Sequence, residues 1–352
     1  MTAATKARRS RLAVIKAYVA LTKPRIIELL LITTVPAMIL AEGGWPGLGL
    51  VAGTVGGGAL SAGGANVINN VVDRDIDARM LRTRKRPLPA ETASPREALV
   101  LGVILGVAGF VVLWIVANIE AALLATGALG FYVFIYTIYL KRITSQNIVI
   151  GGAAGAVPAL VGWAAVTGNV GLPAWLLFAV IFYWTPAHFW ALALRFRADY
   201  EAAGVPMLPV VAGERATAIQ IALYSFVAVG ASLLLQPAAG SGLLYVVAAV
   251  FLGLGFIGAS LTLLGSPSSA MTVFRLSNVY LALLFAAVAL DALISDPVAA
   301  SPAIAWVGSF LVVGGSITIV AATRPNTARE VVFVLIPTAG AIATALTVLS
   351  RT

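Results

Sequence analysis

Three polar residues spaced by four, Asn69, Asp73 and Asp77, form the most informative pattern in the sequence. On a helix this spacing places all three side chains on one face, and we call them the polar stripe. Carboxylates at this spacing repel each other, so a positive group must compensate them. Mg²⁺ is a suitable candidate, because it takes carboxylate and amide oxygens together with substrate phosphates. A solvated loop, in which Arg74, Arg79 and Arg82 neutralise the acids, explains the spacing equally well.

The basic run RTRKRP at 82–87 follows the polar stripe. These cations could orient a membrane span, hold anionic groups, or serve both purposes. Asp75 lies on the opposite helical face from the stripe, so we assign it a structural or salt-bridge role.

A second group of residues with chemical potential lies at 182–211 and includes His188, the only histidine in the chain. A histidine within a membrane is usually functional, although a packed, hydrogen-bonded histidine is the alternative. The neighbouring Tyr183, Trp184 and Trp190 could form walls for a flat apolar ligand, but aromatic residues at a membrane interface need no ligand to explain them. Asp199 follows this segment, four residues after Arg195.

The composition predicts that membrane helices position these groups. The 352 residues are 60% hydrophobic and 11% charged, whereas soluble domains have about 25% charged residues. A span needs roughly 20 mostly apolar residues. Eleven segments meet this requirement, and we predict spans at 26–42, 47–70, 97–117, 119–139, 147–167, 174–194, 217–236, 242–264, 276–294, 302–322 and 331–350.

The distribution of basic residues predicts the topology. With the N-terminus in the cytoplasm and the spans alternating, every Lys and Arg except Arg351 falls on the inner side. The net charge of +9 is therefore a topology signal, and we expect no nucleic-acid partner. We interpret residues 1–16 as a basic cytoplasmic leader, with a short transit peptide as the alternative. The absence of cysteine excludes disulfides, thiol catalysis and haem attachment through cysteine.

At residues 66–89 the sequence resembles the NxxxDxxxD and RTxxRP motifs of the UbiA-type membrane prenyltransferases. The matching positions are Asn69, Asp73, Asp77, Arg82, Thr83, Arg86 and Pro87. In that family the first motif binds a prenyl diphosphate through Mg²⁺. The resemblance implies an all-α polytopic membrane protein with a UbiA-like bundle of nine helices.

The segments TPAHFWALA and DYEAAGVPMLP, within 185–209, are similar to the haem O synthase branch of this family. The stretches 21–34 and 136–168 agree with that branch, and the resemblance covers 17–295. Other family members usually carry a second DxxxD pair, where this chain offers Arg195, Asp199 and Ala203. Residues 296–352 form about two additional spans outside the resemblance, without an assigned role.

The resemblance implies transfer of a farnesyl group from farnesyl diphosphate to a vinyl of haem B, with addition of water, giving haem O. It implies Mg²⁺ as cofactor, and as partners the two substrates, the lipid bilayer, and haem A synthase or oxidase assembly proteins. We expect a bacterial inner membrane and a site that faces the cytoplasm. The implied metal ligands are Asn69, Asp73, Asp77 and Asp199, of which the three aspartates are also the catalytic residues. The implied diphosphate-binding residues are Arg82, Lys141 and Arg195, with Arg25, Arg79 and Arg142 less directly, and the haem-binding residues are His188, Trp184 and Trp190.

Three alternative functions remain open. The chain could prenylate a quinone precursor, although the motif at 182–211 argues against this acceptor. It could be a transporter, but transporter acids should be distributed through the bilayer depth, whereas these gather at the ends of spans two and six. It could be a non-enzymatic assembly protein, but that role gives no reason for the polar stripe.

Overall fold

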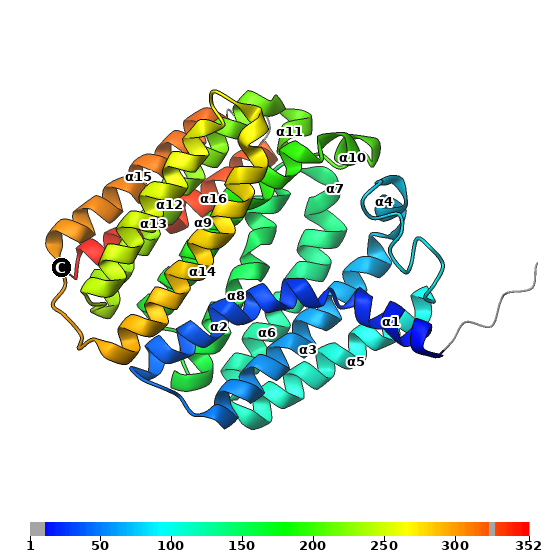
Figure 1. The fold of residues 1–352 in the computed structure, drawn as a ribbon, viewed down its shortest axis with the longest axis horizontal. Coiled ribbons are helices and arrows are strands. Elements are labelled where there is room, and N and C mark those ends of the chain that lie inside the picture. Colours follow the sequence, from blue (N-terminus) through cyan, green and yellow to red (C-terminus); the bar gives the residue numbers. More distant parts are fainter. Residues whose placement is uncertain (1–10, 324–327, 352) are drawn as a thin grey trace, which may run out of the picture.

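The computed structural model describes residues 11–323 and 328–351, which form helices joined by short loops and include no strand. Ten helices in these ranges are long and apolar enough to cross a membrane, so the prediction of an all-α polytopic membrane protein is confirmed. Figure 1 shows them packed into one bundle. The elements are α1 (Arg11–Leu21), α2 (Pro24–Glu42), α3 (Leu48–Val72), α4 (Arg74–Arg79), α5 (Pro95–Val116), α6 (Ile119–Gly130), the π-helix η1 (Phe131–Leu140), α7 (Lys141–Ile143), α8 (Asn147–Thr167), α9 (Leu172–Arg195), α10 (Arg197–Ala202), α11 (Leu208–Val211), α12 (Gly213–Ala239), α13 (Leu243–Thr262), the 3₁₀-helix η2 (Pro267–Ser269), α14 (Ala270–Ile294), α15 (Pro302–Thr323) and α16 (Ala328–Leu349).

Each predicted span coincides with a helical segment, with ends offset by a few residues. The first, 26–42, falls on α2. The fourth is one continuous segment built from α6, η1 and α7. The π-helix within it widens the turn, and such segments often occur at functional sites.

Small residues hold α3 and α5 in close contact. A Cβ added at Gly64 would lie 2.6 Å from the carbonyl oxygen of Gly102, and one added at Gly109 would lie 2.7 Å from the backbone nitrogen of Ser61. The two backbones therefore approach as closely as they do because these positions lack side chains. This contact fixes the helix that carries Asn69.

The ends of spans two and six that lead into α4 and α10 meet at one end of the molecule. The α3 helix ends at Val72, and the short α4 continues the chain into the loop that begins at Met80. The Asp199 carboxylate on α10 accepts hydrogen bonds from the backbone N–H groups of Leu81 and Arg82, at 3.3 Å each. Figure 1 shows α4 and α10 side by side. These two ends therefore lie together in the bundle.

The two C-terminal helices pack directly on the bundle. The α15 helix crosses α12 where Gly230 faces Gly308, and a Cβ on Gly230 would lie 2.9 Å from the Gly308 carbonyl oxygen. The Tyr183 hydroxyl on α9 donates a 2.6 Å hydrogen bond to the Pro337 carbonyl oxygen on α16. The C-terminal pair is therefore in contact with α12 and with α9, the helix that carries His188.

Candidate active site

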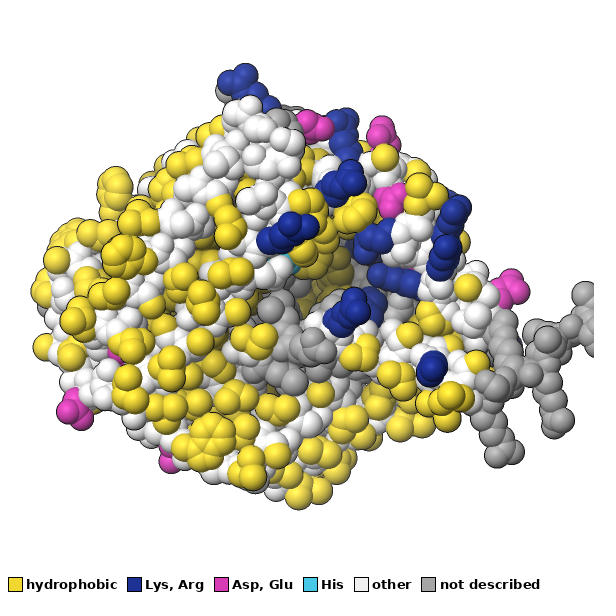
Figure 2. Space-filling view, in the orientation of Figure 1, with side chains coloured by type: hydrophobic (Ala, Val, Ile, Leu, Met, Phe, Trp, Pro, Cys, Tyr) yellow, Lys and Arg dark blue, Asp and Glu magenta, His cyan; other side chains and the backbone are white. Residues whose placement is uncertain are grey.

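A cavity of about 480 Å³ opens at the end of the bundle where α4 and α10 meet. Along α3 its lining extends from Asp73 to Thr54, which corresponds to ~28 Å at the helical rise of 1.5 Å per residue. Figure 2 shows lysine and arginine side chains gathered around a hollow in the surface. The charged lining residues are Lys23, Asp73, Asp77, Arg82, Arg86 and Lys141. Glycine, alanine and other small or apolar residues line the deeper part, so the cavity joins a polar end to an apolar chamber.

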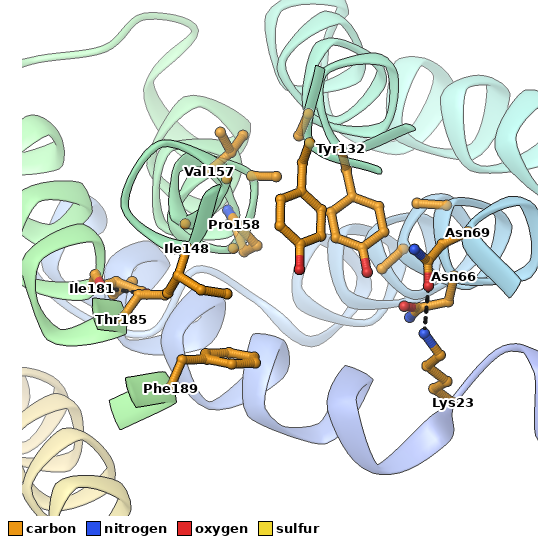
Figure 3. Close-up of a pocket in the computed structure, with 18 of the residues that line it drawn as sticks. Lys23, Asn66, Asn69, Tyr132, Ile148, Val157, Pro158, Ile181, Thr185 and Phe189 are labelled. Atoms are coloured by element: carbon orange, nitrogen blue, oxygen red, sulfur yellow. Dashed lines mark hydrogen bonds between the residues drawn. The ribbon is translucent and has the colours of Figure 1, made fainter. Parts of the chain in front are cut away.

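The polar stripe lies in this polar end. The Asn69 amide donates to Asp73 Oδ2 over 2.7 Å, and Lys141 Nζ lies 2.5 Å from the same oxygen. Lys23 Nζ donates to Asn69 Oδ1 over 2.8 Å, as Figure 3 shows. Asp73 is only 1% exposed, so Lys141 compensates a buried charge. The solvated-loop interpretation is wrong for Asp73, because its partner comes from a different helix.

Asp77 is held by the basic run that follows it. Arg86 Nη1 contacts both Asp77 carboxylate oxygens, at 2.8 Å and 3.0 Å. The Thr83 hydroxyl donates to the Asp77 backbone carbonyl over 2.9 Å. Thr83 and Arg86 of the RTxxRP pattern therefore fold back onto Asp77, and the guanidinium of Arg82 lies over the Phe196 ring at 5.3 Å.

The polar end fits a divalent cation. Asp73 Oδ1 is buried and has no hydrogen-bond partner among the described residues, which leaves one carboxylate oxygen available as a ligand. In the same ranges no group of three or more His, Asp or Glu residues converges on a point. A metal here would therefore take a few protein oxygens and complete its shell with water and substrate, as Mg²⁺ commonly does.

Asp75 has the salt-bridge role predicted for it. Its carboxylate oxygens lie 2.9 Å and 2.8 Å from the guanidinium nitrogens of Arg142. The hydrogen bond from Arg142 is the main cause that lowers the pKa of Asp75 from 3.8 to about 2. The same contact corrects the expectation for Arg142, which does not line the main cavity because Asp75 holds it on the opposite face of the stripe.

Several other predicted residues also lie outside the cavity lining. Asp199 was expected as a metal ligand, but both of its oxygens accept backbone N–H groups of the loop after α4. Arg25, Arg79 and Arg195 have exposed side chains at the surface of this end. The three arginines therefore sit near the expected helix ends with exposed side chains, whereas Asp199 faces the loop after α4. Of the predicted diphosphate-binding cations, Arg82 and Lys141 line the cavity.

An aromatic wall lines the cavity along α9 and α14. The His188 ring stacks on Trp184 at 4.3 Å and on Phe274 at 4.5 Å between centroids, and all three residues line the cavity. Trp190, predicted as a third haem-binding residue, instead is fully buried and meets the Tyr224 ring at 5.5 Å. It lies on the opposite side of α9, so the expectation for Trp190 is corrected.

Sequence reasoning missed Lys23, Tyr132 and Tyr136 as lining residues. Lys23 precedes Pro24 and adopts a positive φ of 54°, which helps to aim its side chain at Asn69. Burial is the main cause that lowers the pKa of Lys23 to about 7. The two tyrosine rings stack at 5.3 Å within η1, and Figure 3 shows Tyr132 between the Lys23–Asn69 contact and Phe189. The sequence FYVFIYTIYL at 131–140 contains both tyrosines, but it does not reveal the π-helix that directs them toward the cavity.

The chain is similar to known proteins both in sequence and in fold. The model of the UbiA prenyltransferase family matches residues 30–279. A protoheme IX farnesyltransferase 1 of Saccharopolyspora erythraea is 53% identical over 82% of this chain and 93% of its own length. A solved digeranylgeranylglyceryl phosphate synthase covers 79% of this chain and 98% of its own, with a TM-score of 0.66 at 20% identity. A UbiA homologue of Archaeoglobus fulgidus bound to GPP and Mg²⁺ covers 77% and 99%, with a TM-score of 0.54 at 16% identity. The chain belongs to the UbiA prenyltransferase family.

Proposed function

We propose that the chain transfers the farnesyl group of farnesyl diphosphate to a vinyl group of haem B and thereby makes haem O. One observation carries the proposal: a single cavity joins a cation-lined polar end to a deep apolar chamber with a His–Trp–Phe wall. The relative from Saccharopolyspora erythraea, named for the same reaction, supports this choice of substrates.

The polar end is suited to the diphosphate. Three cationic side chains face the two carboxylates of the stripe, which leaves a surplus of positive charge for an anionic ligand. These cations are Arg82, Arg86 and Lys141, and Lys23, whose pKa burial lowers to about 7, gains a full charge when an anion binds beside it. Asn69, Asp73 and Asp77 would hold Mg²⁺. The A. fulgidus homologue bound to GPP and Mg²⁺ supports the choice of this metal. When bound, Mg²⁺ would supply positive charge that neutralises the leaving diphosphate.

Ionisation of the farnesyl C–O bond leaves a negative diphosphate and an allylic cation. Lys141 and Arg86 lie where they can stabilise the departing group. The Tyr132 and Tyr136 rings lie beside this end and can stabilise the cation through their π faces. The apolar lining beyond them accommodates the farnesyl chain and keeps water away from the cation.

The acceptor step forms a carbon–carbon bond between the haem vinyl and the first carbon of the farnesyl group. The vinyl supplies the electron pair, so a positive charge appears on the carbon next to the porphyrin ring, which stabilises it. A water molecule then adds its oxygen to that carbon and releases a proton, which leaves a hydroxyethylfarnesyl substituent. The aromatic wall of Trp184, His188 and Phe274 is the surface on which we place the haem.

Asp199 acts as a positioning residue in this scheme. Its carboxylate fixes the backbone at Leu81 and Arg82, and so sets the position of the Arg82 side chain at the cavity mouth. The sorting of basic residues supports a cytoplasmic orientation of this mouth in a bacterial cell membrane.

The test is a reaction with purified protein in lipid nanodiscs, haem B, farnesyl diphosphate and Mg²⁺, followed by mass spectrometry of the extracted haem. We expect haem O, and we expect the yield to fall when Mg²⁺ is chelated. A quinone precursor is offered in parallel as the competing acceptor. Prenylation of that acceptor with no haem O would overturn the proposal.

A further inference from the structure

The geometry points to His188 as an axial ligand of the haem iron through Nε2, with Ser277 fixing the tautomer that this requires. The inference rests on the proposed function, because it concerns the substrate that occupies the aromatic wall. It adds the coordination of the iron, the ring nitrogen that binds it and the residue that orients that nitrogen.

The hydrogen bonds around Ser277 favour one tautomer of His188. Ser277 has one hydroxyl hydrogen, and that hydroxyl donates to the Phe274 carbonyl oxygen over 2.8 Å. His188 Nδ1 lies 2.8 Å from the same Ser277 oxygen. With the serine hydrogen directed at that carbonyl, the Ser277 oxygen acts as an acceptor toward the ring, and Nδ1 carries the proton and donates it. The neutral ring then keeps an unshared electron pair on Nε2, which is the form that binds a metal.

The surroundings of the ring leave only Nε2 free. Trp184 and Phe274 stack on the imidazole, and Ser277 occupies Nδ1. Within residues 11–323 and 328–351 no hydrogen bond reaches Nε2, although His188 is only 7% exposed and lines the cavity. A histidine that merely packs in a core normally has both nitrogens satisfied. The free nitrogen therefore indicates a ligand that enters from the cavity.

The ring is also held rigidly, as a metal ligand should be. The Trp184 indole N–H donates to the Ser277 carbonyl oxygen over 2.7 Å, so Trp184 and His188 are both tied to the same residue of α14. Histidine ligands commonly donate their second N–H to a protein acceptor, which fixes the ring and raises its basicity. Here the serine hydroxyl is that acceptor. His188 lies seven residues before the end of α9, which is ~10 Å below the polar end.

The experiment measures haem coordination without farnesyl diphosphate, so that it is independent of turnover. Haem B is titrated into the full-length protein in nanodiscs, and the absorption and electron paramagnetic resonance spectra are recorded. For the wild type we expect a histidine-ligated iron. For His188→Ala we expect that signature to disappear and added imidazole to restore it. A further variant, His188→Met, should give a spectrum of its own, because the thioether replaces the imidazole at the iron.

Ser277→Ala tests the positioning role. We expect the histidine signature to remain, with haem binding weakened about 10-fold or more, as for other residues that orient a metal ligand. Ser225→Ala is the matched control, because Ser225 also donates to a carbonyl three residues earlier, over 2.7 Å, but does not contact a histidine. We expect wild-type haem binding in that control.

Unchanged spectra and haem affinity in His188→Ala would overturn the inference. Haem O synthesis by the wild type in the same preparation would then leave the proposed function intact. Conversely, a histidine-ligated haem in a wild-type protein that makes no haem O would contradict the proposed function and not the ligand. Elution of each variant as a single folded species is required before its spectrum is interpreted.

Discussion

Replacing Lys141 by methionine should separate the structural cost of the polar stripe from its catalytic role. Lys141 Nζ lies 2.5 Å from Asp73 Oδ2, and the side chains are 13% and 2% exposed. The substitution retains the length of the apolar stem and leaves the Asp73 charge buried without its partner. Breaking a buried pair in this way costs about 3–5 kcal/mol of folding stability. The loss of one cation facing the leaving diphosphate should also slow turnover by about 10²–10³-fold.

Two measurements check these magnitudes. Thermal unfolding in nanodiscs should show a large destabilisation of Lys141→Met in chelator and a smaller one in Mg²⁺, because the metal would replace the missing positive charge. The double variant Lys141→Met/Asp73→Asn should recover much of the stability, since the buried charge is gone, while its haem O synthesis stays low. A single variant with wild-type stability and activity would refute the reasoning. So would a double variant no more stable than the single one.

The remaining predictions concern the metal, the C-terminal helices, acid stability and orientation. Asp73→Ala and Asp77→Ala should each abolish Mg²⁺-dependent haem O formation while the protein remains inserted, and near-normal turnover in either would contradict the metal assignment. Removal of residues 300–352 should leave the site residues in place, yet lower the unfolding temperature, because α12 loses its Gly308 contact and Tyr183 loses its acceptor; an equally stable truncation would show that the pair is peripheral. Because the folded-state pKa of Asp75 is lowered from 3.8 to about 2, its contribution to stability is present above pH 3.8 and lost as the pH falls toward 2, and a pH series of Asp75→Asn should lack this component. Arg84→Cys and Ala202→Cys should resist a membrane-impermeant thiol reagent in intact cells while Trp45→Cys is labelled, and the reverse pattern would invert the orientation; all three positions are exposed and the chain has no cysteine of its own.

The convergence of spans two and six could be predicted because both ends carry basic residues that the positive-inside rule places on one side. The side-chain contacts through which the two ends meet could not be predicted. Asp199 was expected to bind metal, since an acid near a second half-site suggests a ligand, but its oxygens accept the N–H groups of Leu81 and Arg82. One residue along a helix changes the direction of a side chain by about 100°. Sequence spacing does not give the rotation of the short helix α10, and this rotation decides whether Asp199 faces the cavity or a neighbouring backbone.

By itself, the sequence determined the membrane helices, their approximate ends and the shared face of Asn69, Asp73 and Asp77. These properties follow from local quantities, namely the length of apolar runs and the helical period. The tertiary structure decided which charges compensate the stripe: Lys23 lies 46 residues from its partner Asn69, and Lys141 lies 68 residues from Asp73. It also decided that His188 faces the cavity and Trp190 does not. The helical period gives the angle between residues on one helix, but packing sets the rotation of that helix relative to its neighbours. The contact between α3 and α5, which glycines on both helices allow, is an example.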